Sequence, residues 1–199
     1  MKINLNPNTN PVADADREAK IAAGGFGKYY TDNMVTIDWS EADGWSDAQL
    51  HAYGPITLDP ATAVFHYGQE IFEGMKAYSQ PDGTISLFRP DANAGRFARS
   101  AARLALPELS VDEFIETITT LVKQDRKWVP NKVGESLYIR PFMFATEVGL
   151  GVRPSNRAKY VLIATPAGAY FNAANAVTVW ISTEYVRAAI GGTGEAKCG

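Results

Sequence analysis

The fold is decided by the stretch Ser136-Leu137-Tyr138-Ile139-Arg140-Pro141-Phe142-Met143-Phe144-Ala145-Thr146. Its aromatic and branched residues predict a strand, and Lys159–Thr165 and Ala176–Thr183 predict two more strands. Ahead of it, Ser110 and Glu113 form a capping box that predicts the start of a helix. One face of that helix is apolar at helical spacing: Val111, Phe114, Ile115, Ile118, Leu121 and Val122. Because helices and strands are grouped and do not strictly alternate, the pattern predicts an α+β fold.

Before these elements, the sequence predicts two more helices and three more strands. A helix is expected from Pro90 to about Leu104, preceded by a hairpin of Met75–Tyr78 and Thr84–Phe88. Asp59-Pro60 has the chemistry of a helix start. That helix is expected to stop near Gly74 and to carry four apolar or aromatic residues: Val64, Tyr67, Ile71 and Phe72. A first strand is expected from Phe26 onward, with these members: Tyr29, Tyr30, Met34, Val35, Ile37 and Trp39.

Composition shifts divide the chain into four parts. Residues 1–24 are rich in Asn, Ala, Pro and Asp and predict a loosely ordered arm. Residues 25–165 hold most of the predicted elements and form the expected small domain. The Gly, Ala and Asn of residues 166–175 predict a linker. Residues 176–199 are then the expected start of a second domain.

The composition excludes several classes of function. A net charge of -3 and a pI near 5.4 give no overall attraction to nucleic acid or to an anionic membrane. No apolar run is long enough to span a bilayer, and the first residues lack the apolar core of a signal peptide. Cys198 is the single cysteine, so an internal disulfide is excluded and a reducing cytoplasm is expected. One cysteine and two histidines leave no zinc-site spacing.

The last nine residues, Gly191–Gly199, place Lys197 in a glycine-rich segment. A lysine in such a segment is a candidate for covalent attachment of an aldehyde cofactor, since an amine without its proton is a nucleophile. The alternative is a solvated lysine in a mobile tail. A Walker phosphate loop is excluded because Cys198 follows the lysine, and a dinucleotide fingerprint is excluded because Lys197 replaces its last glycine.

Arg140 is the second chemical candidate. It lies in the middle of an apolar and aromatic strand, where a cation is costly unless an anion meets it. Its fork geometry suits a carboxylate or a phosphate. On the helix that begins at Pro90, Arg99 and Arg103 are expected to be a solvated basic face.

A series of short runs carries a family resemblance. In order they are Phe26-Gly27-Lys28, His66-Tyr67-Gly68-Gln69, Phe72-Glu73-Gly74-Met75-Lys76-Ala77, Phe88-Arg89-Pro90, Asn93-Ala94-Gly95-Arg96, Ser136-Leu137-Tyr138-Ile139-Arg140-Pro141, Thr146-Glu147, Leu150-Gly151-Val152, Pro166-Ala167-Gly168-Ala169-Tyr170-Phe171, Arg187-Ala188 and Gly191–Gly199. Together these runs resemble the branched-chain amino acid aminotransferases of the class IV pyridoxal-phosphate enzymes. The resemblance covers about residue 26 to the end.

The resemblance implies a transaminase that exchanges the amino group between L-leucine, L-isoleucine or L-valine and 2-oxoglutarate. Lys197 would hold pyridoxal 5′-phosphate covalently, and Arg96 and Arg187 would lie at or near the cofactor phosphate. Arg140 would receive the side-chain carboxylate of glutamate. The substrate pocket would be lined by four aromatic residues: Phe26, Tyr67, Phe72 and Tyr138. Tyr67, Leu150 and Val152 would reach into a partner subunit, which implies a homodimer with no nucleic-acid or membrane partner.

The resemblance also implies a fold-type IV enzyme whose small α/β domain is followed by the first strands of the large cofactor domain. We expect the acidic partner of the pyridine nitrogen to lie beyond Gly199, so the 199-residue chain is expected to be an inactive fragment of a cytoplasmic biosynthetic enzyme. A D-amino-acid aminotransferase or an aminodeoxychorismate lyase is the alternative within the fold. A non-catalytic dimerisation module is the alternative from another class.

Overall fold

The computed structural model describes residues 1–168 and 176–199. The first of these ranges forms a single mixed sheet with helices against it. Its strands follow the spatial order β1-β3-β2-β8-β7-β5-β6, and β4 pairs with β7. The β1–β3 pair is parallel and the other pairs are antiparallel. The strands are β1 (Asn4–Asn6), β2 (Asn33–Ser40), β3 (Gly44–Ala52), β4 (Glu70–Phe72), β5 (Met75–Ser79), β6 (Ile85–Leu87), β7 (Ser136–Ala145) and β8 (Arg157–Ala167).

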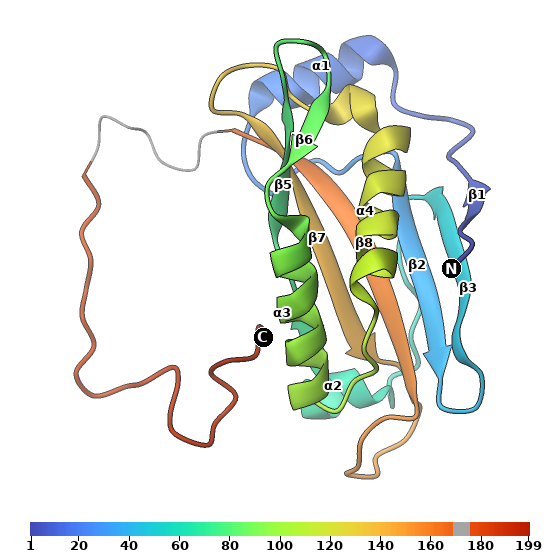
Figure 1. The fold of residues 1–199 in the computed structure, drawn as a ribbon, viewed down its shortest axis with the longest axis vertical. Coiled ribbons are helices and arrows are strands. Elements are labelled where there is room, and N and C mark those ends of the chain that lie inside the picture. Colours follow the sequence, from blue (N-terminus) through green and yellow to red (C-terminus); the bar gives the residue numbers. More distant parts are fainter. Residues whose placement is uncertain (169–175) are drawn as a thin grey trace.

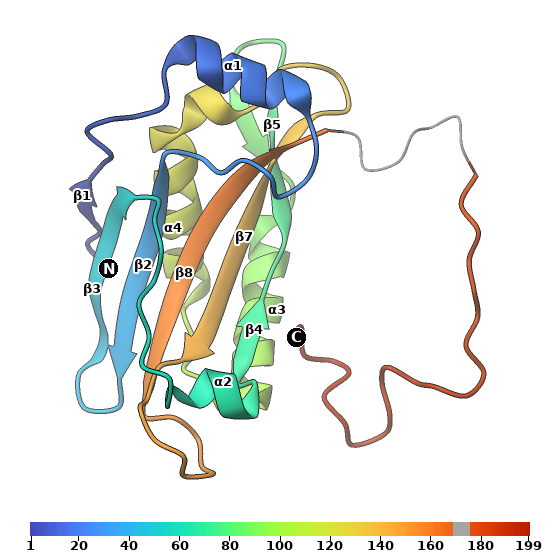
Figure 2. The same cartoon turned by 180° about the vertical axis from the view of Figure 1, so that it is seen from behind.

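Helices α3 (Pro90–Arg103) and α4 (Val111–Gln124) cover one face of the sheet (Figure 1). The other helices are α1 (Asp14–Ala23), the short α2 (Ala63–Tyr67) and a 3-10 turn, η1 (Arg126–Trp128). Seen from behind, the opposite face is crossed by the chain between β3 and α2 (Figure 2). The two faces of the sheet therefore have different surroundings, and this difference positions the site.

Alternation along β7 assigns side chains to the two faces. Leu137, Ile139 and Met143 are fully buried in the main hydrophobic core, which the two long helices share. Tyr138 and Arg140 point to the opposite face and are half-buried. Because successive residues of a strand face opposite sides, a strand that completes the core also presents polar side chains on its other face.

Most of the predicted elements are confirmed, α4 most clearly. The backbone N–H of Glu113 donates to Ser110 Oγ at 3.3 Å, and Ser110 Oγ donates to Glu113 Oε2 at 2.7 Å. The apolar positions Phe114, Ile118 and Leu121 are fully buried. The helix predicted from Pro90 corresponds to α3, and the predicted hairpin corresponds to β5 and β6. The strands predicted at 136–146 and 159–165 correspond to β7 and β8. The second half of the strand predicted from Phe26 onward corresponds to β2. The α+β class is correct.

The helix predicted from Asp59 to Gly74 is wrong in extent. Helix α2 covers only Ala63–Tyr67 and ends at Gly68, whose φ of 58° lies in the left-handed region. The chain then forms β4, in which Ile71 pairs with Met143 and Phe72 with Phe142 of β7. The physical reason is the neighbouring strand, which offers backbone hydrogen bonds to an apolar segment that would also suit a helix.

The strand predicted at Ala176–Thr183 is also wrong, because residues 176–183 contain no strand in the structure. Val179, Trp180 and Ile181 are 77%, 81% and 79% exposed. A strand needs a neighbour to pair with its backbone groups, and none of the described strands lies beside this segment. Residues 169–175, which hold most of the predicted linker, lie outside the described part of the chain.

Two ordered elements lie in residues 1–24, where the sequence predicts a loose arm. Strand β1 pairs with β3, and α1 follows it. Between them, Asn8 N donates to Asn33 Oδ1 at 2.7 Å and Val12 N donates to Asp32 Oδ1 at 2.8 Å. Asn33 is itself fixed by Asp125, which accepts from its backbone N–H at 3.0 Å. Polar contacts that the composition does not reveal therefore hold this segment.

Candidate active site

The backbone of Lys197 is held by two elements, β4 and α3. Its carbonyl accepts a hydrogen bond from the backbone N–H of Phe72 at 2.9 Å, and its own N–H donates to Ser100 Oγ at 2.9 Å. The side chain is half-buried, and Nζ lies 4.5 Å from the centroid of the Phe72 ring. The residue is therefore anchored through its backbone, which argues against the alternative of a solvated lysine in a mobile tail.

A second cation shares the same aromatic ring. The guanidinium carbon of Arg140 lies 4.6 Å from the Phe72 centroid, and Arg140 Nη2 donates to Tyr138 Oη at 2.9 Å. Phe26 packs edge-on against Tyr138 with 4.8 Å between ring centroids. The structure thus brings five predicted site residues together.

The geometry of this cluster follows from the strand register. Tyr138 and Arg140 are two residues apart on β7 and so share a face. Phe72 reaches the same face because it pairs with Phe142. No carboxylate of the described residues forms an ion pair with Arg140, whose neighbours are neutral rings and a phenol. The cluster can therefore receive an anionic ligand beside an amine.

Glycine is required where β4 turns into β5. A Cβ atom at Gly74 would lie 2.2 Å from Tyr138 Oη and 2.9 Å from its Cζ. The backbone must pass this close because Lys76 pairs with Tyr138 across β5 and β7. Gly74 therefore sets the position of the Tyr138 ring.

Arg96 lies beside this turn and is bound by Glu73. Its Nε and Nη2 both donate to the Glu73 carboxylate, the second at 2.9 Å, and Asn93 Nδ2 donates to the same carboxylate at 2.8 Å. Burial raises the pKa of Glu73, but the hydrogen bonds from Arg96, Asn93 and the Gly74 N–H outweigh it and hold that pKa below its usual value. Bonding to Glu73 in turn raises the pKa of Arg96.

Glu73 is a site residue that sequence reasoning missed. Its side chain is fully buried, whereas that of Arg96 is 45% exposed. The available signal is the run Phe72-Glu73-Gly74, where a carboxylate stands between an aromatic residue and a glycine. A fully buried carboxylate needs partners, but the sequence does not show where they lie.

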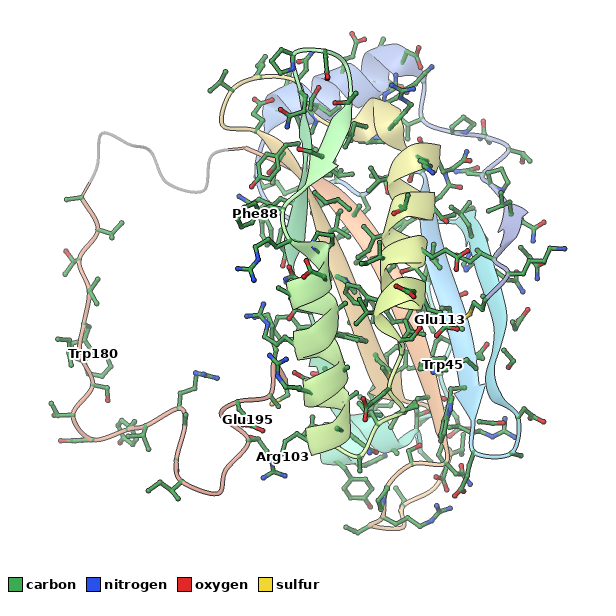
Figure 3. The ribbon with its side chains drawn as sticks, viewed as in Figure 1. Trp45, Phe88, Arg103, Glu113, Trp180 and Glu195 are labelled. Atoms are coloured by element: carbon green, nitrogen blue, oxygen red, sulfur yellow. The ribbon has the colours of Figure 1, made fainter. Side chains whose placement is uncertain are left out.

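Arg187 and Arg103 both contact the glycine-rich segment that precedes Lys197. Arg187 Nη2 donates to the Gly194 carbonyl at 3.3 Å. Arg103 Nη2 donates to the carbonyls of Gly191 and Gly192, both at 3.1 Å. Figure 3 shows Arg103 at the end of α3, next to the returning chain at Glu195. Arg99 and Arg103 are exposed, as expected for a solvated basic face, but Arg103 also has these two backbone partners.

Tyr67, Leu150 and Val152 form a separate group. Tyr67 Oη donates to the Leu150 carbonyl at 2.5 Å. The three side chains are 42%, 64% and 86% exposed, and Phe65 and Val148 beside them are 61% and 59% exposed. Within the described part of the chain, no side-chain hydrogen bond joins Tyr67 to the cluster at Lys197. This apolar surface is a candidate protein interface.

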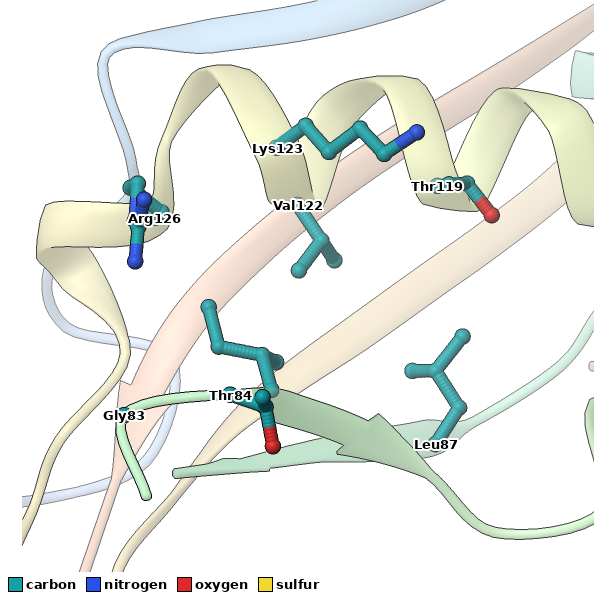
Figure 4. A pocket seen from close by; sticks show the side chains of 8 residues that line it. Gly83, Thr84, Leu87, Thr119, Val122, Lys123 and Arg126 are labelled. Atoms are coloured by element: carbon teal, nitrogen blue, oxygen red, sulfur yellow. The ribbon is translucent and has the colours of Figure 1, made fainter. Parts of the chain in front are cut away.

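A groove of about 440 Å³ lies elsewhere, between β6 and α4 (Figure 4). It is lined by Gly83, Thr84, Ile85, Leu87, Thr119, Val122, Lys123 and Arg126. None of the ten predicted site residues, all of which are described, contributes to it. The described residues also contain no group of three or more His, Cys, Asp or Glu side chains suited to a metal ion. None of the described helices is both long enough and apolar enough to cross a membrane.

The relatives found by comparison with known proteins share one name. The chain is 56% identical over 199 residues to a probable branched-chain-amino-acid aminotransferase of Streptomyces coelicolor, covering 99% of the chain and 55% of that protein. It is 58% identical over 201 residues to the branched-chain-amino-acid aminotransferase of Mycolicibacterium smegmatis, covering all of the chain and 55% of that protein. The chain thus spans about half the length of the curated relatives it matches. No family model matches it.

Solved structures with a similar fold carry the same name as these relatives. The Escherichia coli branched-chain amino acid aminotransferase aligns with a TM-score of 0.52 at 25% identity, over 69% of this chain and 41% of that one. The Thermobaculum terrenum enzyme of the same name aligns with a TM-score of 0.52 at 18% identity, over 69% and 41%, a likeness of fold alone. The expected fold-type IV architecture is therefore confirmed. Over its whole length, the chain is therefore similar to about half the length of branched-chain-amino-acid aminotransferases.

Proposed function

We propose that the protein carrying this sequence is a pyridoxal-phosphate-dependent branched-chain amino acid aminotransferase with Lys197 as its reactive lysine. One observation carries the proposal: the Lys197 backbone is fixed at both its N–H and its carbonyl, with Nζ over Phe72. Arg140 lies over the same ring and has no ion-pair partner among the described residues. Such an arrangement offers an amine and an anion-binding group to one bound molecule. The names of the relatives support the same activity.

The residues present fit pyridoxal 5′-phosphate, an aldehyde that carries a phosphate. Lys197 offers a half-buried amine to the aldehyde. Arg96 lies one helical turn before Ser100, the residue that holds the Lys197 N–H, so its guanidinium is close to the lysine anchor. Because Glu73 engages only part of that guanidinium and the side chain is 45% exposed, donors remain for a phosphate. Arg187 bonds to Gly194, three residues before Lys197.

When bound, the cofactor supplies the electron sink that stabilises negative charge at the substrate α-carbon. The Lys197 amine then accepts the proton that leaves that carbon and later returns a proton to the product. Its fixed backbone keeps the amine within reach in both steps. Arg96 and Arg187 would hold the phosphate and so orient the cofactor.

The aromatic residues and Arg140 provide substrate selection. Phe26, Phe72 and Tyr138 form an apolar wall suited to the side chains of leucine, isoleucine and valine. Arg140 lies at the same wall and binds the side-chain carboxylate of glutamate or 2-oxoglutarate. Arg140 donates a hydrogen bond to Tyr138 Oη, and this bond would hold the guanidinium aside when an aliphatic side chain is bound.

We further propose that the protein is a homodimer that acts in cytoplasmic amino-acid biosynthesis. The exposed group of Tyr67, Leu150 and Val152 would pack against a partner subunit and extend towards its active site. The exposure of these side chains and their apolar character support this assignment.

The product of the complete gene tests the activity. Incubation with L-leucine and 2-oxoglutarate should yield glutamate, whereas D-alanine should give no product. A preference for D-alanine would instead identify a D-amino-acid aminotransferase. A stable dimer that retains no pyridoxal phosphate would identify a non-catalytic dimerisation module, and replacing Lys197 by Ala is the matched control for retention of the cofactor.

The isolated 199-residue chain should show no measurable turnover of L-leucine, because it spans about half the length of its relatives. Turnover by the purified chain at a rate comparable with that of the complete gene product would contradict this prediction.

A further inference from the structure

The segment before Lys197 returns to α3 after a long excursion from the sheet (Figure 1). Three contacts with the body hold it there: Arg103 with the carbonyls of Gly191 and Gly192, Ser100 Oγ with the Lys197 N–H, and the Phe72 N–H with the Lys197 carbonyl. Ala196, next to the lysine, is 4% exposed. The last residues of the segment, up to Lys197, are therefore fixed against α3 and β4.

Ser100 is the buried member of this set. It is 1% exposed and lies on the face of α3 that also buries Phe97 and Ala101. A buried serine on an otherwise apolar helix face costs free energy unless its hydroxyl is hydrogen-bonded. The Lys197 N–H, 97 residues away in sequence, is the partner at 2.9 Å.

We propose that Ser100 is a positioning residue for Lys197, an inference that rests on the proposed function. Its hydroxyl oxygen fixes the Lys197 backbone, and the Phe72 N–H fixes the other side of the same residue. Because both backbone groups are bound, the Cα of Lys197 is fixed. The side-chain amine can then occupy only the space above the Phe72 ring. Restricting the search in this way raises the effective concentration of the amine at the cofactor aldehyde.

Ser136→Ala is a matched control for Ser100→Ala. Ser136 is also a serine that is 1% exposed, and among the described residues its Oγ has no hydrogen-bond partner. Both substitutions remove one buried hydroxyl, but only the change at Ser100 removes a contact with Lys197. A general effect of deleting a buried hydroxyl would appear in both variants.

The first measurement uses no cofactor. In the 199-residue chain, the Lys197 amide should exchange with solvent about 10-fold faster in Ser100→Ala than in the parent, because one buried hydrogen bond is lost. Core amides such as those of Phe97 and Ile139 should keep their protection, which separates a local effect from global destabilisation. Unchanged exchange at Lys197 would overturn the proposal.

The second measurement uses the product of the complete gene, as parent and variants, and follows pyridoxal phosphate attachment at Lys197, trapped by borohydride and located by peptide mass mapping. Ser100→Ala should label at Lys197 about 5- to 10-fold more slowly than the parent, again the effect of one buried hydrogen bond, and Ser136→Ala should match the parent. Equal labelling of all three chains would overturn the positioning role. If the parent itself is not labelled at Lys197, the proposed function fails, whereas the exchange result still decides the Ser100 contact.

Discussion

At the scale of single residues, Glu73 links the elements that surround Lys197. Its buried carboxylate joins α3 to the turn between β4 and β5 through Arg96, Asn93 and the Gly74 N–H. The same turn presents Phe72, which contacts Lys197 through both its N–H and its ring. The position of Lys197, the proposed reactive lysine, therefore depends on a carboxylate that takes no part in the proposed chemistry.

Replacing Glu73 by Ala should lower the free energy of unfolding by about 2 kcal/mol, because Asn93 and the Gly74 N–H lose a charged partner. The effect stays moderate since water can reach Arg96. Chemical denaturation measures it, with the exposed Glu41→Ala as a control that should change little. Equal losses in the two variants would contradict the prediction.

The contribution of Glu73 should also depend on pH. Its folded-state pKa lies below its usual value of 4.5, so the stabilisation is present above that pH and is lost as the pH falls through the folded-state pKa. In Glu73→Gln, the free energy of unfolding should fall less steeply on acidification below about pH 4.5 than in the parent. Parallel pH profiles for the two chains would contradict this assignment.

Gly74 provides a steric prediction at the same scale. A methyl group there would lie 2.2 Å from Tyr138 Oη, so Gly74→Ala should displace the Tyr138 ring and cost about 1 to 3 kcal/mol. Gly54→Ala is the matched control, because a Cβ atom added there would meet no other atom within 4 Å and its φ is not positive. Thermal unfolding of both variants measures the difference, and equal midpoints would show that the clash is relieved elsewhere.

At the scale of elements, α4 is a helix whose start is encoded locally. Replacing Ser110 by Ala removes the acceptor of the Glu113 N–H and should cost about 1 kcal/mol. Ser110→Asp keeps an acceptor at the helix start and should retain most of the stability. Denaturant unfolding compares the two variants, and equal destabilisation by both would mean that the cap does not contribute.

At the scale of the whole molecule, the body of the sheet is well covered whereas the segment 176–190 is not. Its large apolar side chains are exposed, Trp180 and Ile181 by about four-fifths, and Figure 3 shows Trp180 on the part of the chain farthest from the sheet. Such surfaces favour association with other molecules.

We therefore expect the 199-residue chain to self-associate through this segment. The double replacement Trp180→Ser and Ile181→Ser should lower the apparent mass in sedimentation experiments and leave the unfolding midpoint unchanged. Val133→Ser is a suitable control, because Val133 is also exposed but stands alone in a different loop. If the control lowers the mass equally, the segment is not the cause.

The sequence alone determined the elements whose signals are local. The capping box and helical spacing of α4, and the residues of α3, β7 and β8, follow from neighbouring residues, so they are predictable. The family resemblance also selected Lys197, Arg140, Phe72, Tyr138 and Phe26, which the structure brings together. Its assignments at Leu150 and Val152 stay predictions.

Only the tertiary structure decided the elements that depend on a distant partner. Ile71 and Phe72 form a strand because β7 offers them hydrogen bonds, whereas Ala176–Thr183 has no such neighbour among the described strands and forms none. The partners of Glu73 and Ser100 lie about 20 and 97 residues away in sequence. Pairing across such separations depends on how the whole chain packs, and no local pattern records it.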